Sequence, residues 1–285
     1  QGNLRYSDLR DDFGYVYLYD FAGRTGTTLS RYYYGQDSSG HELIGNAILK
    51  YDTSFERFDS STLFGLEFRD AATDQTSYYG EASSLDIANP VYSGAPAELS
   101  VYSEARNDYR AKSAFVTQNL SFDDRIVATV GLRHDWLDLS SKGQTFGTAF
   151  DDSDSFSETS WRGALTYKVT PEISTYVSYV ESVAPPSVGV EPERGEQYEI
   201  GVKYEPAGTD ALISASIYDL TQQNITVAEV QDDGNILRRT VGKTRVRGFD
   251  IEGKAELAQN LDVLASYSYM DSEVVTDPVL KGKQF

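Results

Sequence analysis

Residues 126–136 read IVATVGLRHDW, a stretch in which apolar and polar side chains alternate almost without a break. A period of two residues is typical of a β-strand with one apolar face, because successive side chains point to opposite sides. One face carries Ile126, Ala128, Val130, Leu132 and Trp136, and the other carries Arg125, Thr129, Gly131, Arg133 and Asp135. The stretch predicts a strand of about ten residues, longer than the five or six usual in soluble sheets.

The same alternation recurs along the whole chain and predicts about eleven strands. It is clearest in residues 64–69, 161–169, 197–204, 249–257 and 261–269. Strands of about nine to eleven residues can cross a bilayer at a tilt, and their mean hydropathy stays low because only alternate side chains face lipid. We therefore expect an all-β fold, an antiparallel transmembrane β-barrel, in which residues 1–285 form one incomplete barrel domain.

The predicted connections between strands fall into two classes of length. Short ones are expected at residues 58–60, 123–124, 170–172, 206–210 and 258–260, and longer ones at 80–108, 141–157, 184–194 and 228–235. The two classes alternate strictly, as do the short periplasmic turns and longer extracellular loops of outer-membrane barrels. A β-sandwich has no reason to alternate in this way, although a soluble all-β binding protein stays an alternative.

The composition narrows the class of protein further. Hydrophobic residues make up 40% of the chain, and no run approaches the roughly 18 apolar residues of a transmembrane helix. The formal net charge of −19 argues against a nucleic-acid partner, which requires a basic face. Cysteine is absent, so we expect no disulfide and no thiolate metal site. The 21 tyrosines and 13 phenylalanines suit both strands and membrane interfaces.

The polar face of the predicted strands carries charges that lipid would not tolerate. It includes Arg133, Arg162, Lys203, Asp250, Glu252 and Lys254. Arginine or lysine facing lipid at the bilayer midplane costs about 2–4 kcal/mol. We therefore expect these side chains to face a lumen that is filled with water or packed against a polar plug.

No motif in the sequence supports an enzyme, a cofactor or a bound metal. Residues 242–244 (GKT) imitate the end of a phosphate-binding loop but lack the glycine that the motif requires five residues earlier. The acidic residues 151–154 lack the glycine of a calcium loop, so we interpret them as part of a solvated loop. His134 is expected on the apolar face and His41 in a turn or loop, so the two histidines do not form a site.

Four tyrosines near predicted strand ends are candidates for a substrate-binding site: Tyr17, Tyr19, Tyr78 and Tyr79. The first two share one face just before a turn expected at Gly23. The other two are expected to end the strand that contains Phe64, and alternation places Tyr79 on the lumen face with Glu67 and Arg69. Aromatic rings with a few polar groups suit a bulky, mostly neutral ligand at the extracellular mouth, while a simple aromatic girdle is the alternative.

Several segments resemble those of a known family, in the same order and spacing. These are residues 130–136 (VGLRHDW), 161–163 (WRG), 176–182 (YVSYVES), 193–204 (ERGEQYEIGVKY) and 247–252 (RGFDIE). They are similar to strand sequences of TonB-dependent siderophore receptors. The resemblance covers nearly the whole chain and is strongest to hydroxamate receptors of the ferrichrome type.

This resemblance implies a plugged barrel of about 22 strands in the bacterial outer membrane, surrounded by lipid and lipopolysaccharide. The chain would supply about half of the wall, without the plug and the closing strands, and alone would neither insert nor transport. A ferric siderophore would be the cargo, held between extracellular loops and plug, with no resident cofactor. The TonB-ExbB-ExbD system, driven by the proton-motive force, would then pull on the plug.

The resemblance also bears on the site. A Tyr-x-Tyr that contacts the siderophore in ferrichrome-type receptors matches residues 17–19 (YLY), and Tyr79 matches the first ring of an aromatic-Gly-Tyr run. Glu81 replaces the second ring, and the loop before Gly195 is shorter, so the identity of the ligand stays open. A carbohydrate or cobalamin receptor of the same superfamily, and a passive porin-like channel, are therefore alternatives.

Overall fold

The computed structural model describes residues 1–20, 24–92, 98–230, 236–277 and 280–284, with side chains in these ranges except at 226–230, 236–241 and 257. Within these ranges the regular structure consists of eleven β-strands, the number expected from the sequence. They are β1 (Gly2–Tyr19), β2 (Thr28–Phe55), β3 (Phe58–Asp86), β4 (Ser100–Phe122), β5 (Ile126–Thr145), β6 (Thr148–Lys168), β7 (Ile173–Ala184), β8 (Glu193–Tyr204), β9 (Ala211–Val230), β10 (Ile236–Ala258) and β11 (Leu261–Thr276). The described residues include no helix long and apolar enough to cross a membrane.

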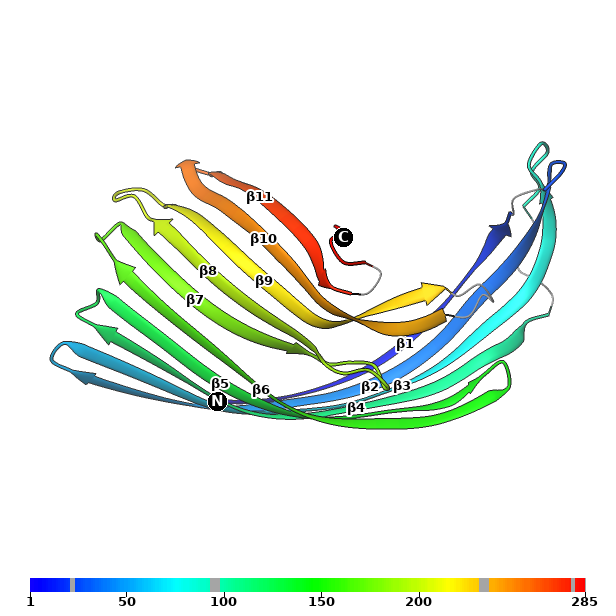
Figure 1. The fold of residues 1–285 in the computed structure, drawn as a ribbon, viewed down its shortest axis with the longest axis horizontal. Coiled ribbons are helices and arrows are strands. Elements are labelled where there is room, and N and C mark those ends of the chain that lie inside the picture. Colours follow the sequence, from blue (N-terminus) through cyan, green and yellow to red (C-terminus); the bar gives the residue numbers. More distant parts are fainter. Residues whose placement is uncertain (21–23, 93–97, 231–235, 278–279, 285) are drawn as a thin grey trace.

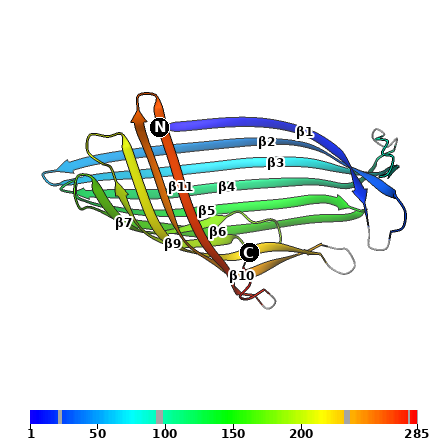
Figure 2. The same cartoon turned by 90° about the horizontal axis from the view of Figure 1, so that it is seen from above.

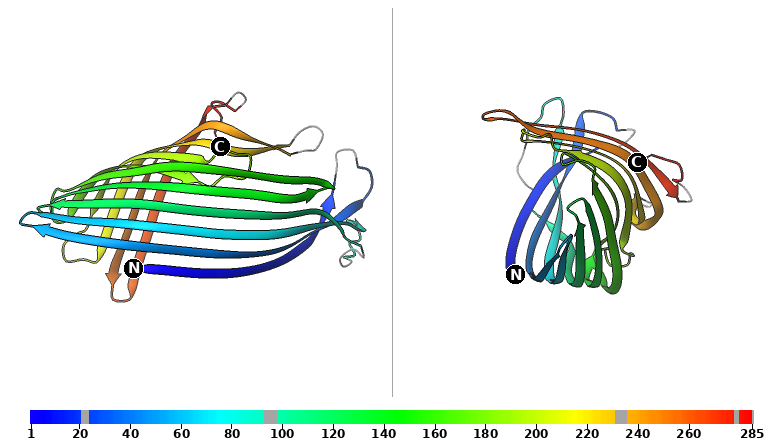
Figure 3. Two further views of the ribbon diagram at one scale, coloured as in Figure 1. Left: turned by 90° about the horizontal axis from the view of Figure 1, so that it is seen from below. Right: turned by 90° about the vertical axis from the view of Figure 1, so that its left-hand side faces the viewer.

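All eleven strands form a single antiparallel sheet in chain order, with β1 at one edge and β11 at the other. Figure 1, Figure 2 and Figure 3 show this sheet bent into an open trough, along which β1–β6 run side by side. Every strand pairs with its neighbours in the chain, so the whole sheet is a series of hairpins. The expectation of an all-β antiparallel architecture is confirmed.

Most turns lie close to the expected positions, but residues 141–157 are not a long loop. Strand β5 continues to Thr145 and β6 begins at Thr148, with only Phe146 and Gly147 between them. Both residues have positive φ angles, 49° and 77°, as in the two-residue turns that match the twist of a hairpin. Short and long connections therefore do not alternate strictly.

The cause of this error is that the distal half of the hairpin faces water on both sides. Its Asp- and Ser-rich residues show no alternation of hydropathy, although the backbone ladder continues without a break. Strand β3 likewise continues to Asp86, beyond the end expected near Tyr79, so the next connection spans residues 87–99 and not 80–108. His41, expected in a turn or loop, lies inside β2.

One face of the sheet, called the outer face below, is apolar, and none of the described segments of the chain packs against it. Leu66, Val130 and Leu132 lie on it and are 62%, 60% and 51% exposed. Few apolar residues in the described part of the chain are buried, so this sheet does not enclose a conventional core. An apolar surface of this extent is typical of a strand face that contacts lipid.

The opposite face, called the inner face below, carries the charges that the sequence predicts away from lipid. Arg133 donates hydrogen bonds to Glu67 at 2.7 Å and to Asp135 at 2.9 Å. A cavity of about 460 Å³ lies on this face, lined by Glu67 and Arg133 together with Val183 and Pro185 from the end of β7. Strand β7 lies two places beyond β5 in the sheet, and only the concave side of a bent sheet brings such distant segments together. The inner face is therefore the concave face, as expected for a lumen.

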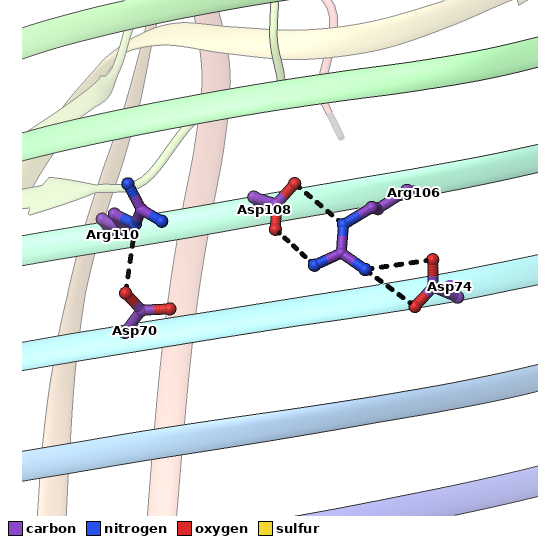
Figure 4. Close-up of polar contacts among 5 residues, drawn as sticks. All are labelled: Asp70, Asp74, Arg106, Asp108 and Arg110. Carbon is purple, nitrogen blue, oxygen red and sulfur yellow. Dashed lines mark hydrogen bonds and ion pairs between the residues drawn. The ribbon is translucent and has the colours of Figure 1, made fainter.

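Paired charges mark the place where the apolar band of the outer face ends (Figure 4). Beyond Phe68 on β3, the outer face carries Asp70 and Asp74. Asp70 pairs with Arg110 of β4 at 3.0 Å, and Asp74 pairs with Arg106 at 3.2 Å. Such exposed pairs contribute little to stability, but they show that the strands continue beyond the part of the sheet suited to lipid.

Candidate functional site

Nine aromatic rings gather on the inner face beyond this boundary. They come from β1 to β4 and the β5–β6 turn: Phe13, Tyr15, Tyr17, Tyr19, Tyr32, Tyr34, Tyr79, Tyr102 and Phe146. We call this set the aromatic cluster. The β2–β3 ladder is unbroken from Glu67 to Tyr79, so these two odd-numbered residues of β3 lie on the same face.

Tyr32 is the centre of one half of the aromatic cluster. Its ring stacks on that of Tyr79, with centroids 5.4 Å apart and planes inclined by 20°. It also lies 6.0 Å from the Tyr17 ring and 5.9 Å from the Tyr19 ring. Strand alternation positions these rings, because Tyr17 and Tyr19 share a face of β1 and Tyr17 pairs with Tyr32 across the ladder. Ring contacts at such distances contribute about 0.5–1.5 kcal/mol each, so they order the surface.

Tyr34 is the centre of the other half. Its ring lies 5.9 Å from Phe13, 5.6 Å from Tyr15 and 6.3 Å from Tyr102. Tyr102 in turn stacks on Phe146 at 5.2 Å. The β3–β4 register shifts at this point and leaves Tyr102 without a ladder partner. A β-bulge of this kind redirects a side chain, and here it places Tyr102 against Tyr34.

Amides and hydroxyls border the rings on β2 and β3. The Tyr34 hydroxyl donates to Gln36 Oε1 at 2.9 Å, and the Gln75 amide donates to the same oxygen at 2.9 Å. The Gln36 amide donates in turn to Ser38 at 3.0 Å. The aromatic cluster therefore adjoins a row of neutral hydrogen-bonding groups.

Exposure and protonation leave the aromatic cluster able to bind a ligand. Tyr17 and Tyr79 are each 37% exposed and Tyr19 is 53% exposed, while their backbones are fixed in the sheet. Partial burial, reinforced by neighbouring tyrosines, raises the pKa of the Tyr17 and Tyr79 phenols. Both phenols are therefore neutral at physiological pH, and each offers an apolar ring together with a hydroxyl donor.

Three of the four tyrosines singled out in the sequence belong to the aromatic cluster. These are Tyr17, Tyr19 and Tyr79, and the last lies on the inner face as alternation predicts. Tyr78 lies on the outer face instead, where its hydroxyl donates to Asp37 at 2.8 Å. The turn expected at Gly23 lies outside the described residues. A role in ligand binding stays a prediction for all four tyrosines, and the outer-face position of Tyr78 argues against that role for this residue.

The other six rings of the aromatic cluster were not predicted from the sequence, although part of the signal was present. Phe13 and Tyr15 continue the two-residue period of Tyr17, and residues 32–34 (YYY) lie at the expected height on β2. Tyr102 could not be found in this way, because a bulge and not alternation sets its direction. Phe146 was hidden because residues 141–157 were interpreted as a loop.

The β7–β8 connection, residues 185–192, folds over the inner face of β4–β6. The backbone N–H of Gly189 donates to the Asp154 carboxylate at 2.5 Å. A cavity of about 870 Å³ lies here, lined by residues that include Asn107, Tyr109 and Ser141 of the strands and Pro186 and Gly189 of the connection. This part of the lumen is polar, in contrast to the aromatic cluster.

The other motifs of the sequence lie in strands and form no site. Residues 151–154, expected in a loop, belong to β6, and residues 242–244 belong to β10. His134 lies against Trp136 with ring centroids 4.4 Å apart, on the apolar face where it was expected. Within the ranges that the structure describes, no three His, Asp or Glu side chains converge as metal ligands.

Two curated relatives support a receptor identity. The chain is 30% identical over 272 residues to the ferrichrome outer membrane transporter/phage receptor of Escherichia coli K12, covering 90% of this chain and 36% of that protein. It is 28% identical over 275 residues to the ferrioxamine B receptor of Salmonella typhimurium LT2, covering 94% of this chain and 38% of that protein. The chain thus spans little more than a third of the length of these relatives.

Solved structures show the same fold at low sequence identity. The closed form of the ferric-catecholate import receptor Fiu of Escherichia coli K12 superposes with a TM-score of 0.81 at 17% identity, covering 96% of this chain and 45% of that chain. The ferripyoverdine receptor of the Pseudomonas aeruginosa outer membrane, bound to ferripyoverdine, gives 0.75 at 15% identity, with 100% and 39% covered. The eleven strands therefore correspond to about half of such a barrel.

The family profile described as "TonB dependent receptor-like, beta-barrel" matches residues 1–285. The sequence left three classes of protein open: a receptor, a porin-like channel and a soluble all-β binding protein. This match supports the receptor class. It also agrees with the lack of a catalytic motif, since these proteins are receptors and not enzymes. The chain belongs to the TonB-dependent receptor family of outer-membrane β-barrels.

Proposed function

We propose that this chain supplies the ligand-binding wall of an outer-membrane receptor that imports ferric hydroxamate siderophores. The aromatic cluster is the observation that carries the proposal. Tyr17, Tyr19 and Tyr79 expose ring faces and neutral hydroxyls on the inner face, beside the amides of Gln36 and Gln75. A bulky chelate with apolar edges and carbonyl oxygens is the type of ligand that such a surface binds.

The names of the curated relatives support the same ligand class. Two of the most similar ones are a ferrichrome transporter and a ferrioxamine B receptor, and both of these ligands are hydroxamates. Iron would enter as part of the cargo, held by the siderophore and not by protein side chains. One fold serves many ligands, so the ligand class is tested directly by binding.

Energy for import would come from the TonB-ExbB-ExbD system. In this proposal a plug lies against the inner face at membrane level, where Arg133, Glu67 and Asp135 already satisfy one another. A wall whose charges are paired can contact a polar plug and let it move without leaving a charge unpaired. The outer face would contact lipid, and the paired charges of Figure 4 would lie at the level of lipid headgroups and lipopolysaccharide.

The test is ferric hydroxamate binding to the receptor purified in detergent from outer membranes, followed by quenching of aromatic fluorescence. Tyr17→Ala and Tyr79→Ala are each expected to weaken binding of ferrichrome or ferrioxamine B about tenfold, as for central aromatic contacts. Tyr78→Ala is the matched control, because it removes a neighbouring ring from the outer face. Its affinity is expected to equal that of the unmodified receptor.

Other outcomes would overturn parts of the proposal. Tight binding untouched by either inner-face change would leave the receptor in place but remove the aromatic cluster as its site. Binding of cobalamin or a carbohydrate, with no binding of hydroxamates, would move the receptor to another ligand class within the superfamily.

A further inference from the structure

The lysines and arginines that the structure describes on β1–β6 avoid the inner face around the aromatic cluster. Beyond Arg69 of β3 and Arg133 of β5, the inner-face positions of β1–β6 in the described ranges hold no lysine or arginine. Basic side chains at this height point to the outer face, as Arg106 and Lys142 do in their pairs with acidic neighbours. The chain has 25 lysines and arginines, so the gap does not arise from a shortage of them.

Two further arginines near the aromatic cluster are already engaged. Arg24, in the β1–β2 connection, pairs with Asp20 at 2.7 Å. Arg31 occupies an outer-face position of β2 and is buried. Its guanidinium donates hydrogen bonds to the Ser83 carbonyl at 2.6 Å and to the Ser83 hydroxyl at 2.8 Å. Neither guanidinium is therefore placed to balance a negative charge on a ligand that contacts the rings.

What the inner face does offer at this height is electron-rich rings and carboxylates. Asp11, Glu81, Asp152 and Asp154 occupy its positions on β1, β3 and β6. Glu81 lies close enough to Tyr79 to contribute to the raised pKa of that phenol. Ring faces attract cations, and a negative surface repels anions before contact is made.

We infer that the aromatic cluster selects ferric complexes of neutral or positive net charge and discriminates against anionic ones. The inference rests on the proposed function, because it concerns the same surface, and it adds the charge of the ligand to its class. Lower on the inner face arginines are present and pair with carboxylates: Arg133 pairs with Glu67 and Asp135, and Arg69 pairs with Glu42. The charge preference therefore belongs to the mouth and not to the lumen as a whole.

The test uses one iron chelate with three different ends. Ferrioxamine B carries a terminal ammonium group; its N-succinyl derivative carries a carboxylate, and the corresponding succinamide is neutral and of nearly the same size. Binding to the receptor is measured for all three at low and high salt. The carboxylate form is expected to bind at least about fivefold more weakly than the amide, with a gap that narrows in salt, and the ammonium form at least as tightly as the amide.

Two lysine substitutions on β2 locate the effect. Gln36→Lys places a cation beside the Tyr34 hydroxyl, whereas Ser39→Lys places the same charge on the exposed outer face of the same strand. Gln36→Lys is expected to bring the carboxylate-to-amide affinity ratio to one or above, and Ser39→Lys to leave it unchanged. Gln36→Met separates the loss of the amide hydrogen bonds from the gain of charge.

The outcomes separate the inference from the proposed function. Equal binding of the three chelates, or tighter binding of the carboxylate form, would overturn the inference and leave the hydroxamate receptor standing. An equal shift from both lysines would show that net charge, and not the aromatic cluster, sets the preference. Binding of none of the three would remove the proposed function and the inference together.

Discussion

Leu132→Arg is expected to destabilise the barrel far more than Ser140→Arg, although both lie on the outer face of β5. The outer-face residues from Ile126 to Trp136 are apolar apart from His134. At about 3.3 Å per residue and a tilt of about 45°, Leu132 lies roughly 14 Å above Ile126, and Trp136 lies roughly 23 Å above it. The apolar band of such barrels is about 25 Å tall, so Leu132 lies near its middle.

The magnitude follows from that depth. An arginine facing lipid at the midplane costs about 2–4 kcal/mol, which is roughly a 30- to 800-fold change in the unfolding equilibrium. Leu132 is 51% exposed, so little protein surrounds it that could shelter a guanidinium. Ser140 lies beyond the apolar band, at a height where an arginine costs about 0–1 kcal/mol.

The assay is urea unfolding of the receptor in phospholipid vesicles, with the folded fraction taken from its heat-modifiable mobility in gels. A shifted midpoint with an unchanged denaturant slope would report stability alone. Equal destabilisation by both arginines, or a loss below about 0.5 kcal/mol for Leu132→Arg, would refute the assignment of the outer face to lipid.

Two further predictions concern packing and pH. A Cβ at Gly65 would overlap the Phe115 ring across the ladder. Gly65→Ala is therefore expected to lower the free energy of unfolding in urea by about 1–3 kcal/mol, and by much less in a Phe115→Ala background. Equal losses in the two backgrounds would contradict this contact. The Arg57 guanidinium lowers the pKa of Asp123, so the stability from this pair is present above the usual aspartate pKa and lost as pH falls through the lower folded pKa. Arg57→Met is expected to raise the Asp123 pKa in NMR titration, and an unchanged value would contradict the pairing.

The number of strands and their antiparallel arrangement could be predicted from the sequence because the contact of one face with lipid gives the hydropathy a period of two residues. Around Val130 and Leu132 one face meets lipid and the other meets the lumen, so hydropathy has a period of two. Beyond the pairs at Asp70 and Asp74 both faces meet water, and the period disappears while the ladder continues. The predicted strand ends were therefore wrong beyond this boundary, as in the hairpin around Phe146. At the short turns of the opposite rim the predicted strand ends lie closer to the observed ones.

The site was predicted only in part for a related reason. Alternation tells which residues of one strand share a face, so Tyr17 and Tyr19 could be placed together and Tyr79 could be placed with Glu67 and Arg69 on the lumen face. It doesn't tell which residues of neighbouring strands lie opposite one another, and that register brings Tyr32 between the first two and Tyr79. A bulge adds Tyr102 by breaking the alternation itself. The same ladder turns the rings of the aromatic cluster inward and the basic side chains at that height, such as Arg106 and Lys142, outward. The inferred charge preference of the mouth follows from this separation of rings and charges.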